Sequence, residues 1–197
     1  MMTVPNLKVT VKGTGSVLPL GTVFSKPSPY GVVEVRNIQD RAWQLTIDGQ
    51  NQMKCKRGYR EPGVDKLLAA TVPTKVFMAG LGAGVMAREV LDDPRVMALD
   101  IYEINPIVIE AQKHFPFSID DPRVTITVGD ARKALEGFDA QYDALVINIE
   151  NRGRSHVDWF YTDEARLAYK RALRDGGAYT LWDIGRIDKV TMESKRG

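Results

Sequence analysis

The sequence contains one cysteine, Cys55, which therefore has no partner for an internal disulfide. This suits a reducing compartment, and we expect a cytoplasmic protein in which Cys55 is an inert, small side chain. No stretch approaches the roughly 18 consecutive apolar residues that a membrane-spanning helix needs. Residues 1–6 lack the charged and apolar regions of a signal peptide. We therefore expect no association with a membrane.

A strong charge of either sign is also lacking. The net charge is +2, with basic and acidic residues interleaved along the chain, and this gives no reason to expect a nucleic-acid surface. Hydrophobic residues make up 44% and charged residues 26% of the 197 residues, the balance of a globular chain that can bury a core. The length fits one domain, or one domain with a small appendage.

The pattern of the chain changes near Pro62-Gly63. Before this point, short alternating runs separated by glycine, proline and asparagine predict the strands of a β-meander. These strands are expected at 7–12, 30–38, 41–47 and 52–56. Asp48-Gly49 is the clearest turn, since both residue types tolerate a positive φ. We therefore expect an N-terminal β-strand domain over residues 1–60 and a second domain over residues 61–197.

Strands and helices alternate in the second part. Short apolar runs predict buried parallel strands at 75–79, 96–102, 124–128, 142–147 and 178–182. Asn105 followed by Pro106 predicts a helix start, as does Thr162, whose helix we expect to end at Gly176-Gly177. The predicted fold class is α/β, with a doubly wound, Rossmann-like parallel sheet and the small β-meander domain before it. Ligands of such sheets bind at the carboxyl ends of the strands.

A glycine-rich loop follows the first parallel strand. Gly80, Gly82 and Gly84 let the backbone turn tightly and approach a ligand closely, and the next helix offers free N–H groups at its start. Glu103 ends the following strand, 19 residues after Gly84, near the spacing of about 20 for an acid that binds ribose hydroxyls. The loop and this acid together predict a nucleoside site.

Two cofactor classes fit this site. Gly82, Gly84 and Ala87 satisfy the loose dinucleotide pattern G-x-G-x-x-A, so a nicotinamide enzyme is one alternative. Gly129-Asp130-Ala131, after the third strand, favours an adenosyl sulfonium compound. The carboxylate of Asp130 can accept a hydrogen bond from an adenine amino group, and a small neighbour leaves room for the ring.

In their order and spacing, these motifs resemble those of spermidine synthases (polyamine aminopropyltransferases). The likeness spans residues 28–182 and includes Gly80-Leu81-Gly82-Ala83-Gly84, Arg88-Glu89-Val90-Leu91, Tyr102-Glu103-Ile104-Asn105-Pro106, Asp121-Pro122-Arg123-Val124 and Gly129-Asp130-Ala131. The resemblance implies a small β-domain on a fold like that of class I S-adenosylmethionine-dependent methyltransferases, and a homodimer or higher homo-oligomer. It also implies a site in which Glu103 holds the ribose and Asp130 the adenine, with Ile104, Ala131 and Gln52 around the nucleoside and Tyr59 near the acceptor.

The departures from the family pattern concern the chemical step. Ala83 stands where the family has the acid that holds the amino group of decarboxylated S-adenosylmethionine, and Asn148 and Asn151 replace two further acids. A protonated amine has no lone pair for attack until a base accepts its proton, and an amide cannot serve as that base. Glu150 would share a face of extended backbone with Asn148 and is a candidate for a displaced carboxylate.

Three functions follow as alternatives. The first is a spermidine-synthase-like transferase that uses S-adenosylmethionine or its decarboxylated form, gives methylthioadenosine as product, and acts on a small molecule such as a polyamine. The second is an S-adenosylmethionine-dependent methyltransferase on the same fold. The third is a non-catalytic protein that binds an adenosyl nucleoside. We expect no metal ion in any of them.

Overall fold

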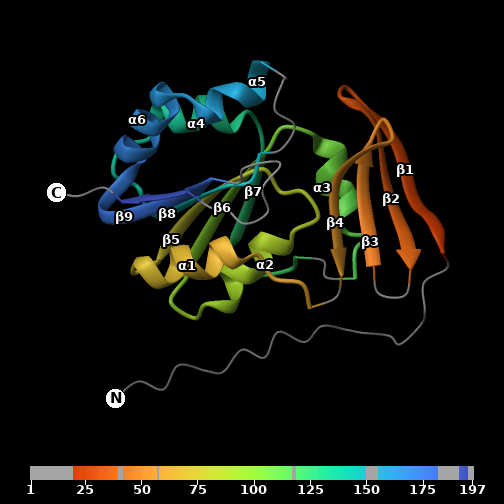
Figure 1. The fold of residues 1–197 in the computed structure, drawn as a ribbon, viewed down its shortest axis with the longest axis horizontal. Helices are drawn as coiled ribbons and strands as arrows, with labels where there is room; N and C mark the ends of the chain where they lie inside the picture. The colour runs from red at the N-terminus through yellow and green to blue at the C-terminus, as the bar shows by residue number, and fades with distance from the viewer. Residues whose placement is uncertain are drawn as a thin grey trace.

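Two separate β-sheets organise the described part of the chain (Figure 1). The computed structural model describes residues 20–39, 42–56, 58–116, 119–149, 155–181 and 191–194. The first sheet is antiparallel, with strand order β1-β2-β3-β4, and the second has strand order β10-β9-β8-β5-β6-β7. Strands β5 to β9 run parallel to one another. The predicted α/β fold, with a small β-meander before a Rossmann-like sheet, is therefore confirmed.

The N-terminal sheet is a simple meander. Its strands are β1 (Gly21–Ser28), β2 (Gly31–Gln39), β3 (Ala42–Ile47) and β4 (Gln50–Lys56). Asp48 and Gly49 have φ values of 49° and 72°, so the predicted turn between β3 and β4 is confirmed. The sequence did not predict β1, because most of its side chains are exposed and it lacks an alternating apolar pattern. The strand expected at 7–12 lies outside the described residues.

The strand order of the second sheet places a switch point at its centre. Its parallel strands are β5 (Lys75–Ala79), β6 (Ala98–Glu103), β7 (Val124–Val128), β8 (Tyr142–Ile147) and β9 (Leu173–Leu181). From β5 the chain builds outward to β6 and β7, and then returns to add β8 on the other side. Ligands of doubly wound sheets bind at such a point, outside the carboxyl ends of the strands.

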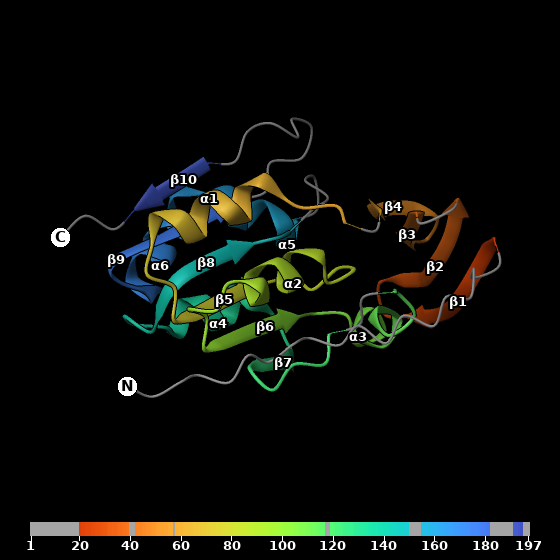
Figure 2. The same cartoon turned by 90° about the horizontal axis from the view of Figure 1, so that it is seen from below.

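Helices cover both faces of this sheet (Figures 1 and 2). On one face lie α1 (Pro62–Ala70) and α2 (Val85–Asp92), and on the other lie α4 (Ala131–Gly137) and α6 (Asp163–Ala172). The short α5 (Ser155–Asp158) and the 3-10 helix Trp159–Tyr161 precede α6. None of the helices within the described ranges is long and apolar enough to cross a membrane.

Helix α3 (Pro106–Gln112) lies between the two sheets. Asn105 caps it by accepting a hydrogen bond from the Ile107 backbone N–H at 3.0 Å, as its sequence predicted. Val108 and Ala111 pack in one hydrophobic cluster with Val33 of the N-terminal sheet. The two sheets are therefore joined through a shared apolar core rather than by a shared strand.

Three features differ from the sequence-based expectations. The last long helix ends at Ala172 instead of at Gly176-Gly177, because Leu173 is fully buried and pairs with Tyr142 at the start of β9. The glycines lie within β9, where the pairing register with β8 shifts. Helix α4 was not expected. The strand β10 (Thr191–Ser194), also unexpected, adds antiparallel to β9.

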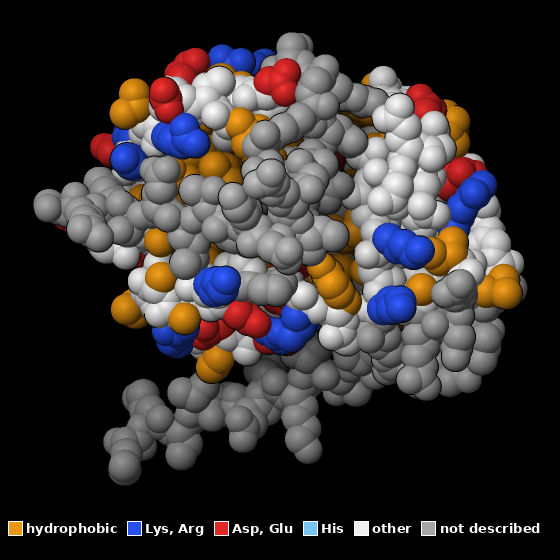
Figure 3. Space-filling model, viewed as in Figure 1, with side chains coloured by type: hydrophobic (Ala, Val, Ile, Leu, Met, Phe, Trp, Pro, Cys, Tyr) orange, Lys and Arg blue, Asp and Glu red, His pale blue; other side chains and the backbone are white. Residues whose placement is uncertain are grey.

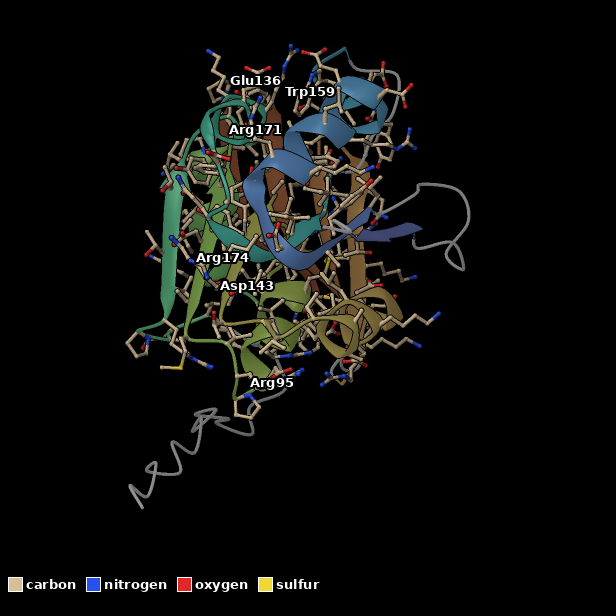
Figure 4. The ribbon with its side chains drawn as sticks, turned by 90° about the vertical axis from the view of Figure 1, so that its left-hand side faces the viewer. Arg95, Glu136, Asp143, Trp159, Arg171 and Arg174 are labelled. Atoms are coloured by element: carbon tan, nitrogen blue, oxygen red, sulfur yellow. The ribbon has the colours of Figure 1, made fainter. Side chains whose placement is uncertain are left out.

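A polar network fixes the amino ends of the central strands. Asp143, at the start of β8, accepts hydrogen bonds from the backbone N–H groups of Thr74 and Lys75 at 3.0 and 2.7 Å. Arg174 donates to the same carboxylate at 3.1 Å, and Figure 4 shows these two residues side by side. Although burial raises the pKa of Asp143, these hydrogen bonds outweigh it and lower the pKa. The carboxyl ends of the strands lie at the opposite edge of the sheet, where ligands of such folds bind.

Candidate functional site

A cavity lies between the N-terminal sheet and the carboxyl ends of the parallel strands. Figure 2 shows β6 and β8 pointing toward the N-terminal sheet. We call the side that the parallel strands supply the floor; it is lined by Gly80, Gly82, Tyr102, Glu103, Ile104, Asn105, Gly129, Asp130, Ala131, Asn148 and Ile149. We call the side that the N-terminal sheet supplies the roof; it is lined by Tyr30, Leu45, Ile47, Gln52 and Met53. Val108, Val157 and Phe160 complete the wall.

The glycine loop forms the centre of the floor. Gly80 has φ +83°, and a Cβ added there would lie 2.5 Å from the backbone oxygen of Asn148, so the loop passes the end of β8 at a distance that a side chain would block. A Cβ on Gly82 would instead lie 3.6 Å from both the Met53 Cε of the roof and the Asn148 Nδ2. Gly82 therefore lies close to Met53 of the roof and to the side chain of Asn148.

Ala83 and Gly84 lie outside the cavity lining. Ala83 is fully buried and belongs to the hydrophobic cluster shared with the N-terminal sheet. Gly84, at φ +81°, is the N-cap of α2 and packs against Gln112 and Ile119. The sequence grouped both with the ligand-binding residues, but the structure gives them a packing environment.

Glu103 ties two strand ends together beneath the cavity. Its Oε2 accepts a hydrogen bond from the Leu81 N–H at 2.9 Å, and its Oε1 accepts one from the Asn105 N–H, also at 2.9 Å. Burial raises the pKa of Glu103, and the backbone hydrogen bonds from Asn105 and Leu81 oppose that shift. The backbone N–H groups of Gly82 and Ile104 also lower the pKa of Glu103, and its side chain lines the cavity.

Asp130 follows β7 and starts the helix that the sequence did not predict. Its Oδ1 accepts a hydrogen bond from the Arg132 N–H at 2.9 Å and so caps α4. The cap does not use Oδ2, and the half-buried side chain lines the cavity. Ala131 beside it is nearly buried and small, while Ile104 is 37% exposed at the end of β6. These residues surround a space that is polar at one side and apolar at the other.

Asn148 is the polar residue at the end of β8. Its backbone N–H donates to the Ala79 carbonyl at 2.9 Å, which extends the β5–β8 pairing, and its buried side chain lines the cavity. Glu150 and Asn151, the other two predicted catalytic residues of this segment, lie outside the described residues. Tyr59 is 36% exposed, hydrogen bonds to the Glu61 carboxyl, and does not line the cavity.

The charge of the cavity is acidic and local. Among the described residues that line it, the charged side chains are Glu103 and Asp130, whereas the roof is mostly apolar. Over the described part of the face in Figure 3, Lys and Arg side chains are interspersed with Asp and Glu side chains. Within the described ranges, no group of three or more His, Cys, Asp and Glu side chains is placed to hold a metal ion.

Sequence reasoning did not identify the apolar and aromatic residues of the roof and the wall. Leu45, Ile47 and Met53 come from strands whose alternation predicts burial but does not say what they cover. Phe160 lies in a 3-10 helix that the sequence did not predict, and Tyr30 was expected only as the start of a strand. An aromatic residue directly after Ser28-Pro29, in a turn, was the one local signal available.

Residues 65–185 match the model of the spermine/spermidine synthase domain. A polyamine aminopropyltransferase of Korarchaeum cryptofilum is 33% identical over 133 residues, which cover 64% of this chain and 41% of that protein. A putrescine N-methyltransferase of Nicotiana tabacum is also 33% identical, over 151 residues that cover 70% of this chain and 42% of that protein. The chain thus spans less than half the length of these two relatives.

Solved structures agree in fold. A spermidine synthase from Thermotoga maritima superposes with a TM-score of 0.69 at 22% identity, covering 82% of this chain and 56% of that one. A spermidine synthase in complex with the transition-state analogue AdoDATO superposes with a TM-score of 0.68, also at 22% identity, covering 82% and 57%. Both the N-terminal sheet and the parallel sheet are needed to reach such coverage of this chain.

Proposed function

We propose that this chain, which belongs to the spermine/spermidine synthase family, binds an adenosyl sulfonium compound in its cavity and transfers a group from it to a small-molecule acceptor. The donor is S-adenosylmethionine or its decarboxylated form, and methylthioadenosine is the product when an aminopropyl group is transferred. One observation carries the proposal. Two carboxylates, Glu103 and Asp130, follow adjacent strands and line the same cavity as Gly80 and Gly82.

The described residues suit the nucleoside part of such a donor. Glu103 would accept hydrogen bonds from the ribose hydroxyls, and the Oδ2 of Asp130 would accept one from the adenine amino group. Ile104 and Ala131 would flank the base, with Gln52 above it in the roof. When bound, the donor supplies an electrophilic carbon beside a positively charged sulfur, and two nearby carboxylates favour that charge.

The acceptor part of the cavity is less suited to a polycation. Asn148 lies where the family resemblance places an acid, and an amide can orient an amine but cannot accept its proton at neutral pH. The roof residues Leu45, Ile47 and Met53 add apolar surface. These residues support an acceptor with less positive charge than a fully protonated polyamine, or a transfer that is slow with polyamines.

Methyl transfer is the second candidate function. Ala83 is fully buried, does not line the cavity and carries no carboxylate, so this position offers no acid to hold the amino group of a decarboxylated donor. The 33% identity to a putrescine N-methyltransferase equals that to an aminopropyltransferase. A protein that binds an adenosyl nucleoside without catalysis is the third candidate.

We also propose a domain boundary between residues 60 and 61, a homodimer or higher homo-oligomer, and a cytoplasmic location. The boundary would fall in the segment between β4, which ends at Lys56, and α1, which begins at Pro62. Light scattering coupled to size-exclusion chromatography measures the oligomeric state, and a monomeric mass would contradict that part of the proposal.

Thermal unfolding with added ligands tests the proposed binding. S-adenosylmethionine, its decarboxylated form, methylthioadenosine and NADH are compared, since a ligand at about 100 times its dissociation constant adds roughly 2.7 kcal/mol of stability. Stabilisation by an adenosyl sulfonium compound or methylthioadenosine is expected in the wild type, and weaker stabilisation in Glu103→Gln. Glu136→Gln, a change of an exposed acid on α4, is the matched control. Stabilisation by NADH alone would contradict the proposal.

Product analysis then separates the candidate functions. Incubation with putrescine and each donor yields spermidine and methylthioadenosine from aminopropyl transfer, or a methylated amine and S-adenosylhomocysteine from methyl transfer. Binding without either product would identify the third candidate.

A further inference from the structure

Two carboxyl groups are buried where the chain passes from the roof to the floor. Glu61, just before α1, is 4% exposed, and Glu89, in α2, is 1% exposed. The Glu61 backbone N–H donates a hydrogen bond to Oε1 of Glu89 at 2.7 Å. The Oε2 atoms of both residues are buried and have no hydrogen-bond partner among the described residues. Such groups are costly to keep ionised.

Among the described residues, the cation that lowers the pKa of Glu89 is Arg60, while Arg95 in the same hollow pairs with Asp93 at 2.6 Å. Arg60 donates to Asp65 and to Asp92, at 2.8 Å each, and so is shared among several acids. The pKa of Glu89 is raised to about 7, and burial is the largest cause. The negative charges of Glu61 and Asp65 add to this rise, whereas the hydrogen bond from the Glu61 N–H and the charge of Arg60 oppose it. Burial likewise raises the pKa of Glu61, and a hydrogen bond from Tyr59 opposes that shift.

The position of the pair connects the two sides of the cavity. Strand β4, which supplies Gln52 and Met53 to the roof, leads into residues 58–61, while α2 begins at the end of the glycine loop. Besides the bond between Glu61 and Glu89, the Arg88 guanidinium donates to the Tyr59 carbonyl at 3.2 Å. We call residues 58–61 and their bonds to α2 the joint. The joint therefore connects the roof to the floor by two hydrogen bonds.

We propose that Glu89 is a positioning residue for the cavity: it keeps its proton in the folded chain, and release of that proton near neutral pH loosens the joint. An ionised Glu89 would place a charge beside the buried carboxyl of Glu61, and opening the joint would hydrate both. The protonated Glu89 contributes stability that is fully present below the pKa of a glutamate in the unfolded chain. This contribution is lost as the pH rises toward the pKa of Glu89 in the folded chain. The effect on stability does not depend on the proposed function, whereas the effect on ligand binding does.

The substitution Glu89→Gln tests the proton. It keeps an oxygen for the Glu61 N–H and cannot ionise. Between pH 5 and pH 8 the thermal midpoint of the wild type is expected to fall relative to that of Glu89→Gln. The same comparison with Glu136→Gln, an exposed acid, is expected to give a constant difference. If Glu89→Gln does not fold, Glu61→Gln serves in its place, since either substitution removes one of the two buried acids.

Two readouts test the positioning. Hydrogen–deuterium exchange of the peptide covering residues 58–66 is expected to be faster in the wild type than in Glu89→Gln at pH 8, and equal at pH 6. The two proteins are compared with each other at each pH, so that the effect of pH on the intrinsic exchange rates is the same for both. The affinity of the wild type for methylthioadenosine is expected to fall about tenfold from pH 6 to pH 8, the effect of one pKa unit, while that of Glu89→Gln stays constant.

The outcomes are distinct. A stability difference between the wild type and Glu89→Gln that does not change with pH would show that Glu89 holds no proton and would overturn the proposal. A pH-dependent stability difference with unchanged exchange at residues 58–66 would overturn the positioning role. If no adenosyl compound binds either protein at any pH, the proposed function fails, and stability and exchange still decide the role of Glu89.

Discussion

Asn105 donates a hydrogen bond from its side-chain Nδ2 to the Ser28 Oγ at 3.0 Å, although the two residues are 77 positions apart. Asn105 follows Ile104 of the cavity floor, and Ser28 lies at the turn that carries Tyr30 of the roof. The Ser28 hydroxyl also donates to the Gly31 carbonyl at 2.7 Å. One polar chain therefore links the floor, through α3, to the roof.

Loss of this link is expected to destabilise the fold by an amount that depends on which end is removed. Ser28→Ala should cost about 1–2 kcal/mol, because it removes the bond to Asn105 together with the bond to the Gly31 carbonyl. Asn105→Ala should cost about 2 kcal/mol, because it also removes the cap of α3. Chemical denaturation measures both, and the double variant should lose less than the sum, since the two changes break the same bond. Full additivity would contradict a direct link.

Gly80 is expected to tolerate no side chain. Gly80→Ala would bring a Cβ within 2.5 Å of the Asn148 carbonyl at a φ of +83°, so we expect a loss of about 2 kcal/mol or more in unfolding free energy. Gly137→Ala is the matched control. No described atom lies within 4 Å of its added Cβ, and Gly137 ends α4, so its stability should be unchanged or slightly higher. Equal effects of the two substitutions would contradict this packing.

Asp130→Asn should change which base the cavity prefers. Asparagine caps a helix as well as aspartate does, so α4 is retained. With its oxygen in the cap, the new amide would present an NH₂ group where Asp130 presents Oδ2, and two donors would then face each other at an adenine amino group. The preference for methylthioadenosine over its 6-oxo analogue, methylthioinosine, should fall by about tenfold, which calorimetric titration measures. An unchanged preference would place the base elsewhere.

Asn148→Asp is expected to increase aminopropyl transfer to putrescine. An acid at this position could accept the proton of the attacking amine, an effect that commonly contributes about 100-fold or more to a rate. Turnover is measured by chromatography of spermidine with saturating decarboxylated S-adenosylmethionine, with Asn148→Ala as the variant that lacks both base and amide. If Asn148→Asp and Asn148→Ala give the same rate, the residue does not contact the acceptor.

The Asp143 network makes a prediction at acid pH. Its pKa is lowered in the folded state, so its stabilising effect is present above the pKa of an unfolded aspartate, about 3.8, and is lost as the pH falls through the folded value. Asp143→Asn should therefore be less stable than the wild type by about 1–2 kcal/mol at pH 7, and the difference should shrink below pH 3. Urea denaturation at both pH values measures it. A difference that is constant with pH would contradict an ionised Asp143.

Local signals predicted the elements that depend on local chemistry. Asn105 with Pro106, and Thr162, start helices because a side-chain oxygen accepts from a nearby N–H, and this needs no tertiary information. Asp48-Gly49 makes its turn for a similarly local reason. Elements held by distant contacts were missed or misplaced: β10 pairs with β9, and Leu173 ends α6 because it is buried beside Tyr142. No window of sequence contains those contacts.

The difference between local signals and distant contacts also explains which residues of the cavity were predicted. Glu103 and Asp130 follow strands at positions that a parallel sheet brings to one edge, so the strand pattern was sufficient to place them together. The roof forms only when the N-terminal sheet packs against the parallel sheet. Nothing in the sequence around Leu45 or Met53 indicates that these side chains line a cavity formed by that packing. Ala83 was grouped with the ligand-binding residues because the family resemblance places an acid there, and its side chain is fully buried in a cluster with residues of the N-terminal sheet.

The division of the cavity between two sheets that share no strand has an evolutionary consequence. If the proposed function holds, substitutions in β3 and β4 can reshape the acceptor side of the cavity without altering the strands that carry Glu103 and Asp130. Descendants of one ancestral chain can thus acquire new acceptors by divergence of the roof while the nucleoside half stays under selection. A lineage containing both aminopropyl- and methyltransferases is the outcome expected of such an arrangement.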